Sequence, residues 1–247
     1  MVVLAAAVVP HPPLLVPELA AGAAGLVAPL LAACDEVVTG LLARSPQTVV
    51  LIGSGQHTGP RAEAETGTLA GFGTGLGTSG SGTSSWGTTE LLSPAQQQLS
   101  LIIGRWLLER AGWTGGTVLY EVAVDTPAED AELLGVRLAA ETGPDSVWLA
   151  LGDGSTRRGP RSPGHDDPRA AGFDAEVVRA FATGDRAALL GLDADLAAEL
   201  GVGGRAVWQV LASAVGAAGW AGIEATVHYD AAPFGVEYLV ADWRPVS

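Results

Sequence analysis

The stretch "VVLAAAVVPHPPLLVPEL", Val2–Leu19, is an apolar run that stops at a proline and carries a histidine just beyond it. The run Val2–Val9 contains no polar residue, which is typical of a strand buried on both faces of a parallel sheet. Pro10 ends the strand, and Pro12 restricts His11 to an extended backbone conformation. The stretch therefore predicts a central strand with a stiffly held histidine at its carboxyl end.

Similar apolar runs alternate with helical patterns along the rest of the chain. The further strands expected are "TVVLIG" (48–53), "TVLYEVAV" (117–124), "SVWLALGDGS" (146–155), "ATVHYD" (225–230) and "GVEYLVADW" (235–243). Apolar residues recur every fourth position at Phe173, Val177 and Phe181, and again from Val207 to Val215, as in amphipathic helices. This alternation predicts a single α/β domain over residues 1–247, with a largely parallel central sheet flanked by helices. Residues 67–93, rich in Gly, Ser and Thr, are expected to be a loop insertion in that domain.

Composition and charge narrow the classes of partner. The chain has 247 residues, of which 48% are hydrophobic, so a large core is expected. Its formal net charge of -14 would repel phosphate backbones, which argues against a nucleic-acid partner. No basic segment precedes the first apolar run, and no uninterrupted apolar run approaches the roughly 20 residues of a membrane span. We therefore expect no membrane partner and a cytoplasmic location. Self-association into a homo-oligomer is left open.

Histidines and carboxylates follow several of the predicted strands. His11 follows the first strand, and His57 follows the second in "LIGSGQHTG". Two imidazoles and a carboxylate form the facial triad that suits non-haem Fe(II). Asp230 and His228 lie two residues apart and are expected on one face of a strand, whereas Glu237 is either a third candidate or a solvated strand position.

The segment "GDGSTRRGPRSPGHDDP", residues 152–168, gathers many polar side chains in one loop: Asp153, Ser155, Arg157, Arg158, Arg161 and His165. Arginines in such a loop can bind an anionic substrate, and a solvated turn-rich loop is the alternative. The single cysteine, Cys34, lies in an apolar helical stretch and is expected in the core. A hydrolase built on Ser54 or Ser155 is disfavoured, because neither serine lies on a nucleophile elbow.

Several segments together resemble the class III extradiol ring-cleavage dioxygenases of the LigB type. They are "VVPHPPLLVPEL" (8–19), "LGDGS" (151–155), "GPRSPGHDDPRAAGFDAEVVRAFATGD" (159–185), "GVGGRAVWQVLASAVG" (201–216) and "YDAAPFGVEYLVADW" (229–243). The resemblance spans almost the whole chain. It implies an α/β domain with non-haem iron held by two histidines and a carboxylate, where a catechol-type ring is opened by dioxygen. Some members of the family hold zinc instead or have unknown roles.

The resemblance also implies roles for individual residues. His11 matches the first histidine ligand, His57 is the candidate for the second, and Asp230 corresponds best to the carboxylate, with Fe(II), zinc or no metal bound. Arg157, Arg158 and His228 are then expected to contact the substrate. Related sequences place an acid/base histidine at the position of Thr156, whose hydroxyl cannot shuttle protons near neutral pH. His165, nine residues further on, is the candidate for the missing catalytic histidine.

Two hypotheses follow from this comparison. The first is a metal-dependent enzyme that oxidises or cleaves a small catechol-like aromatic, which requires His11, His57 and Asp230 or His228 to converge within about 2.0–2.3 Å of one metal. The second is a catalytically inactive or repurposed LigB-like protein that binds a small anionic molecule or a protein partner. Convergence or dispersal of these side chains distinguishes the two hypotheses.

Overall fold

The computed structural model describes residues 3–62, 98–143 and 145–246, which form one α/β layer structure around a central sheet. The sheet has seven strands in the order β3-β4-β2-β5-β1-β7-β6. The strand bounds are β1 Val3–Val9, β2 Thr48–Gly55, β3 Gly59–Arg61, β4 Gly116–Ala123, β5 Ser146–Leu151, β6 Ile223–Ala231 and β7 Tyr238–Pro245. The four strands β4, β2, β5 and β1 are parallel, while β3, β7 and β6 add antiparallel edges. The predicted α/β class and largely parallel sheet are confirmed.

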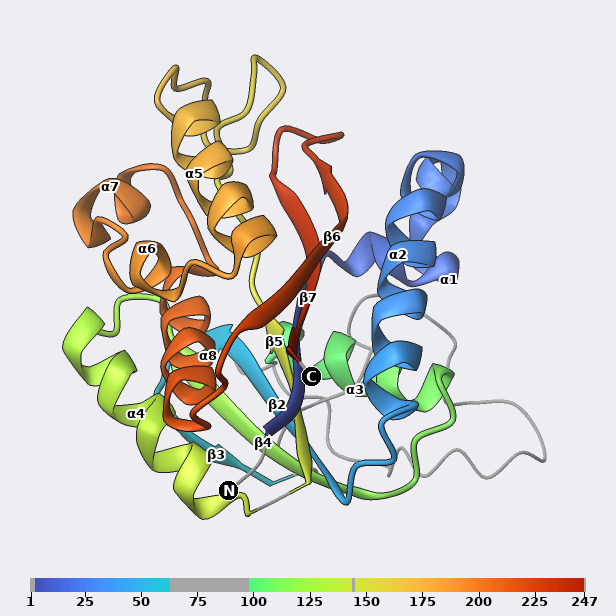
Figure 1. Cartoon of the computed structure of the whole chain (residues 1–247). Coiled ribbons are helices and arrows are strands. Elements are labelled where there is room, and N and C mark those ends of the chain that lie inside the picture. Colours follow the sequence, from blue (N-terminus) through green and yellow to red (C-terminus); the bar gives the residue numbers. More distant parts are fainter. Residues whose placement is uncertain (1–2, 63–97, 144, 247) are drawn as a thin grey trace.

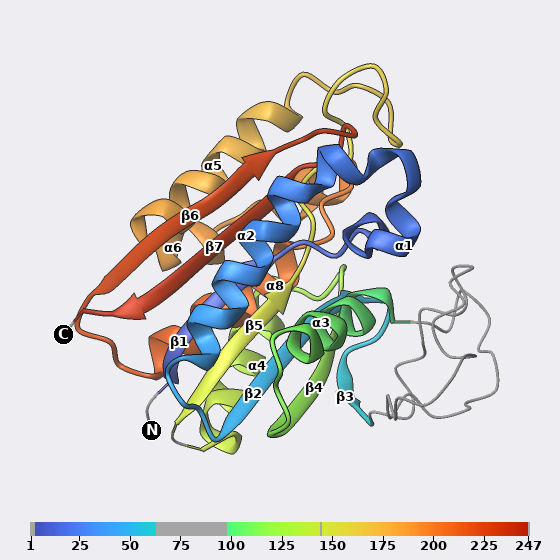
Figure 2. The same ribbon diagram turned by 90° about the vertical axis from the view of Figure 1, so that its right-hand side faces the viewer.

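Helices cover both faces of this sheet (Figures 1 and 2). The first part of the chain forms η1 Pro13–Leu15, α1 Pro17–Ala20, η2 Ala21–Ala23 and α2 Ala24–Leu42, and the later helices are α3 Leu99–Arg110, α4 Ala128–Glu141, α5 Ala170–Thr183, α6 Arg186–Leu190, α7 Ala194–Glu199 and α8 Arg205–Ala217. One core lies between the sheet and α4, α5 and α8, and the other lies between the sheet and α2 and α3. The helical periodicities from Phe173 and from Val207 correspond to α5 and α8.

The first strand is buried along nearly all of its length because it lies inside the sheet, between β5 and β7. The apolar sequence of β1 is thus explained by neighbours on both edges and helices on both faces. The predicted insertion at residues 67–93 lies outside the described residues.

Helix α2 is a core helix that also resembles a membrane span in length and composition. Its buried residues include Leu30, Cys34 and Val38, which pack toward the sheet. Burial, together with the nearby Asp35 and Asp153, raises the pKa of the Cys34 thiol, so this cysteine remains a protonated core residue as expected. A buried helix of a soluble protein passes the same membrane criterion, so α2 is weak evidence for membrane insertion.

Candidate functional site

The carboxyl ends of the parallel strands bring His11 and Asp153 together. Val9 of β1 pairs with Leu151 of β5, so the residues two positions beyond each strand end face one another. The backbone N–H of His11 donates to Oδ1 of Asp153 at 2.9 Å, and Nδ1 of His11 lies 3.3 Å from the same oxygen. The two side chains are 15% and 19% exposed, so this pair remains accessible to a small molecule.

The His11–Asp153 pair lies on the face of the sheet covered by α2. Tyr238, at the start of β7, is buried on this face. Its burial, and secondarily the Asp153 carboxylate and Tyr229, raise the pKa of the Tyr238 phenol. Asp153 also contributes, after burial and Asp35, to the raised pKa of the Cys34 thiol in α2. The Tyr238 phenol and the Cys34 thiol therefore stay neutral near neutral pH.

A buried ionic cluster holds the loop that carries Asp153. Arg158 donates to Asp174 at 3.1 Å and to Glu237 at 2.6 Å, and the hydroxyl of Ser155 donates to Asp174 at 2.5 Å. The backbone adds two bonds, from Gly154 N–H to the Glu237 carbonyl and from Glu237 N–H to the Ser155 carbonyl. The cluster therefore fixes the loop after β5 against the start of β7.

Glu237 is a buried acid rather than a solvated strand residue. Its side chain is 3% exposed, and burial is the main reason that its pKa is raised to about 8. The neighbouring carboxyls of Asp230 and Asp174 raise this pKa further, while Arg158 lowers it. Because its pKa is about 8, Glu237 holds a proton at neutral pH. The Arg158 guanidinium therefore lies beside two buried carboxyl groups, of which that of Glu237 is uncharged. The strand pattern of the sequence gave no indication of this role.

His57 lies apart from His11, on the side of β2 that faces β4. The buried carboxylate of Glu121, on β4, accepts the backbone N–H of Gln56 at 2.8 Å and that of His57 at 3.3 Å. Arg61 completes the anchor by donating to the same carboxylate at 2.8 Å. Gly55 is required here, because a Cβ at this position would overlap the Glu121 carboxylate. The turn leaves His57 exposed, with β5 between its strand and β1.

The carboxylate and histidine expected from β6 are also separate from His11. Asp230 is exposed near the end of β6. The Nε2 atom of His228 lies 2.7 Å from Asp242 of β7, and its Nδ1 lies 3.7 Å from Glu36 of α2. A register shift between Val227 and Tyr229 interrupts the strand alternation on which the pairing of His228 with Asp230 was based. His228 therefore contacts protein carboxylates in the middle of the β6–β7 pair.

The positions of these histidines and carboxylates show whether they could together bind the iron that the resemblance implies. Within residues 3–62, 98–143 and 145–246, no three His, Cys, Asp or Glu side chains are grouped so that they could hold a metal ion. His11 and Asp153 could offer two ligands, and Nδ1 of His11 is buried without a hydrogen-bond partner. His57 and Asp230 do not complete a site with them. The described residues therefore do not fit a metal held by two histidines and a carboxylate.

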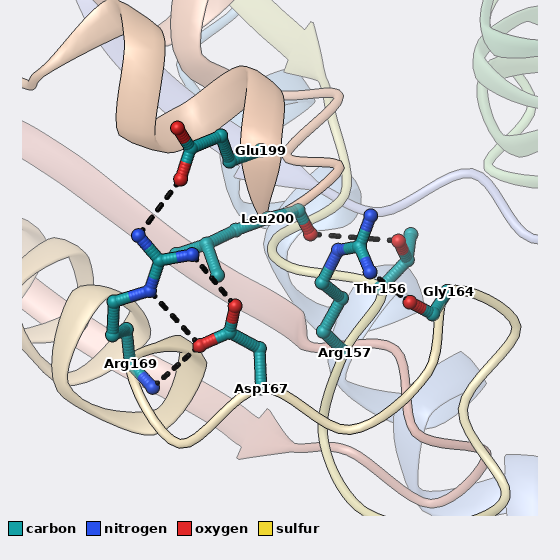
Figure 3. Close-up of polar contacts among 7 residues, drawn as sticks. All are labelled: Thr156, Arg157, Gly164, Asp167, Arg169, Glu199 and Leu200. Carbon is teal, nitrogen blue, oxygen red and sulfur yellow. Dashed lines mark hydrogen bonds and ion pairs between the residues drawn. The ribbon is translucent and has the colours of Figure 1, made fainter.

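The predicted substrate-binding loop makes contacts with the protein itself (Figure 3). Arg157 donates to the carbonyl of Gly164, and the Thr156 hydroxyl is directed at the Leu200 carbonyl, 3.5 Å away. The exposed Arg169 bridges Asp167 and Glu199. His165 is exposed and has a φ of 65°. No hydrogen bond in the described part of the chain links His165 to the His11–Asp153 pair.

Comparisons with known proteins assign no family to this chain. No family model matches it, and neither does any curated protein. One similar solved structure is that of the uncharacterized protein JW3007 from Escherichia coli K12, with 15% identity, 98% of this chain and 99% of that chain covered, and a TM-score of 0.49. The function is therefore argued from the residues of this chain.

Sequence reasoning placed Asp153 in the polar loop but did not pair it with His11. The pairing could have been found from one additional assumption, namely that β1 and β5 are adjacent and in register. Each polar residue comes two positions after its strand, at the edge of the sheet where α/β proteins bind ligands.

Proposed function

We propose that the chain is a cytoplasmic LigB-like protein that has lost ring cleavage and binds a small hydroxylated aromatic molecule at His11 and Asp153. The observation that carries this proposal is the contact between these two side chains at the carboxyl edge of the sheet. Open α/β sheets bind their ligands at this edge. The dispersal of His57 and Asp230, together with threonine at position 156, supports the loss of the ring-cleavage reaction.

The charges around the pair favour a hydroxyl group over an anion. A carboxylate beside an imidazole accepts hydrogen bonds, and a phenolic hydroxyl can donate to it. The arginines that would have attracted an anion already make contacts within the protein. Arg158 bridges Asp174 and Glu237, and Arg157 donates to a backbone carbonyl.

The second candidate is the metal-dependent ring cleavage that the resemblance implies, with Fe(II) or zinc. The observation in its favour is the buried Nδ1 of His11, which has no hydrogen-bond partner among the described residues and lies 3.3 Å from Asp153 Oδ1. The absence of a third ligand among those residues is the observation against it. Metal content distinguishes the two candidates directly.

The test begins with elemental analysis of protein purified anaerobically without chelators, followed by calorimetric titration with phenol, catechol and benzoate. We expect metal-free protein that binds the two phenols more tightly than benzoate. His11→Gln and Asp153→Asn should each raise the Kd for catechol about tenfold, the equivalent of one hydrogen bond. The exposed His165→Gln variant is the control and should leave the Kd unchanged.

Two outcomes would contradict the proposal. Near-stoichiometric iron that is lost in the His11→Gln variant would establish the metal-dependent candidate instead. Failure of both phenols to bind, or equal binding by wild type and both site variants, would remove the His11–Asp153 pair as a ligand site.

A further inference from the structure

Helix α4 has one side packed into the protein and one side that faces away from it. Ala131, Leu134 and Leu138 lie on the buried side. Gly135 brings this side close to α8, because a Cβ at that position would overlap the Val210 carbonyl. α4 thus lies at the outside of the helical layer, next to α8, and its opposite side is directed toward solvent (Figure 1).

The outward side of α4 carries two large apolar side chains about one turn apart. Leu133 is 63% exposed and Val136 is 48% exposed, and Ala140, about one turn further along, is exposed as well. Residues spaced i, i+3 and i+7 form one stripe along an α-helix. Single apolar residues are common on protein surfaces, whereas a stripe of them with the spacing of a helix–helix seam is typical of a contact surface.

Charged residues beside this stripe form a pattern that is complementary to itself. The first turn of α4 contains Glu129 and Asp130, and Arg137, seven residues after Asp130, is the only basic residue of the helix. Arg137 lies 3.8 Å from Glu141, with both side chains more than half exposed, and donates to the Tyr120 hydroxyl at 2.8 Å. An ion pair as exposed as this contributes little to stability, and a guanidinium has five N–H donors. Arg137 can therefore bind a further carboxylate.

We propose that α4 is the contact helix of a homodimer, in which the α4 helices of two copies pack antiparallel across a two-fold axis. Leu133 and Val136 of the two copies then form the apolar centre, and Arg137 of each copy lies beside Asp130 of the partner subunit. A two-fold interface requires a patch that is complementary to itself, and charges beside the seam of a helix pair set its orientation. Parallel helices would instead bring together the acidic first turns of both copies.

The dimer is expected to be weak and reversible. Two helices of 14 residues make a small contact, whereas stable interfaces bury about 1,200–2,000 Å². The net charge of -14 also makes two copies repel each other, so association depends on the local match of apolar and charged side chains. This surface uses different residues from the His11–Asp153 pair and does not depend on the function proposed above.

Exposed positions allow the contact to be changed without changing the fold. Leu133→Glu places a charge in the apolar centre, and Leu26→Glu, at a position on α2 that is 60% exposed, makes the same change elsewhere. Asp130→Arg sets two cations against each other, and the combination Asp130→Arg/Arg137→Asp restores opposite charges. Such surface substitutions usually change stability little, and circular dichroism with urea midpoints verifies that each variant is folded.

The measurement is sedimentation equilibrium of the full chain from micromolar to millimolar concentration. For the wild type and Leu26→Glu we expect the mass to rise with concentration from 25.0 kDa toward twice that value. Leu133→Glu should stay monomeric, Asp130→Arg should raise the Kd of the dimer about tenfold, and the combined variant should recover most of this loss. A wild type that is monomeric at every concentration, or a dimer that persists in Leu133→Glu or dissociates in Leu26→Glu, would overturn the proposal. So would a folded combined variant that associates no better than Asp130→Arg.

Discussion

Oδ1 of Asp153 lies 2.9 Å from the backbone nitrogen of His11 and 3.3 Å from Nδ1 of the same residue. One carboxylate oxygen thus accepts the backbone N–H of His11 and lies near its ring, at the point where β1 and β5 end side by side. The prolines that flank His11 remove much of its remaining backbone freedom. Asp153 is therefore a structural anchor as well as a candidate ligand-binding residue.

Asp153→Ala should destabilise the fold because it leaves the N–H of His11 without a partner in a largely buried position. The expected loss in free energy of unfolding is about 1–3 kcal/mol, the usual cost of an unsatisfied buried donor. Urea denaturation measures it. Glu176→Ala, on the exposed side of α5, is the control and should change stability by less than about 0.5 kcal/mol. Equal stability of the wild type and Asp153→Ala would show that this anchor is dispensable.

Much of the fold could be predicted from the sequence, because burial on both faces leaves a direct trace in it. β1, β2 and β5 are apolar runs of strand length, and Pro10 and Gly152 follow the ends of β1 and β5, whereas β2 continues through Gly55, two residues beyond the expected 48–53. The position of His11 followed from the same pattern. These features depend on local sequence and on the general rule that parallel strands are covered by helices.

The rest of the site depends on contacts between distant segments, which no local pattern reveals. Glu121, on β4, holds the turn of His57 away from His11. Arg158 forms ion pairs with two buried carboxyls, Asp174 of α5 and Glu237 at the start of β7. Thr126 is a smaller example of such a contact, because its hydroxyl pairs with that of Thr58 at 3.0 Å, and Pro127 occupies the N-cap position of α4.

The stability of the wild type should fall as the pH rises through the pKa of Glu237. The folded-state pKa is raised from 4.5 to about 8, so the folded protein binds this proton more tightly than the unfolded chain does. The resulting stabilisation is complete below the unfolded pKa and is lost as the pH rises through about 8. Glu237→Gln imitates the protonated acid and should flatten this part of the profile.

Urea midpoints of wild type and Glu237→Gln at about pH 5 and about pH 9 measure this effect, with the exposed Glu176→Gln variant as the control for other titrating groups. The wild type should lose more stability than Glu237→Gln between the two conditions. Parallel profiles for all three proteins would show that Glu237 titrates alike in the folded and unfolded chains.

Arg158→Met should be strongly destabilising, because it leaves the buried Asp174 carboxylate without its cation and the Glu237 carboxyl without its hydrogen-bond donor. Removing one partner of a buried ion pair costs about 3–5 kcal/mol, and the 31% exposure of Arg158 reduces the expected loss to about 2–3 kcal/mol. Thermal or urea denaturation measures the loss. Arg179→Met, on the exposed side of α5, provides the matched control. A loss no larger than that of the control would mean that water replaces the guanidinium in this cluster.

Gly203 and Gly204 are neighbours that should respond in opposite ways to alanine. A Cβ on Gly204 would overlap the six-membered part of the buried Trp208 ring, whereas a Cβ on Gly203 would have its nearest neighbours at 3.9 Å. The Trp208 ring is packed inside the core and cannot move aside without disturbing its neighbours. We therefore expect Gly204→Ala to lower the free energy of unfolding by about 1–3 kcal/mol, and Gly203→Ala to change it by less than about 0.5 kcal/mol. Urea denaturation of the two variants decides the matter. If Gly204→Ala is as stable as Gly203→Ala, the Trp208 ring moves away from the first turn of α8 without loss of packing.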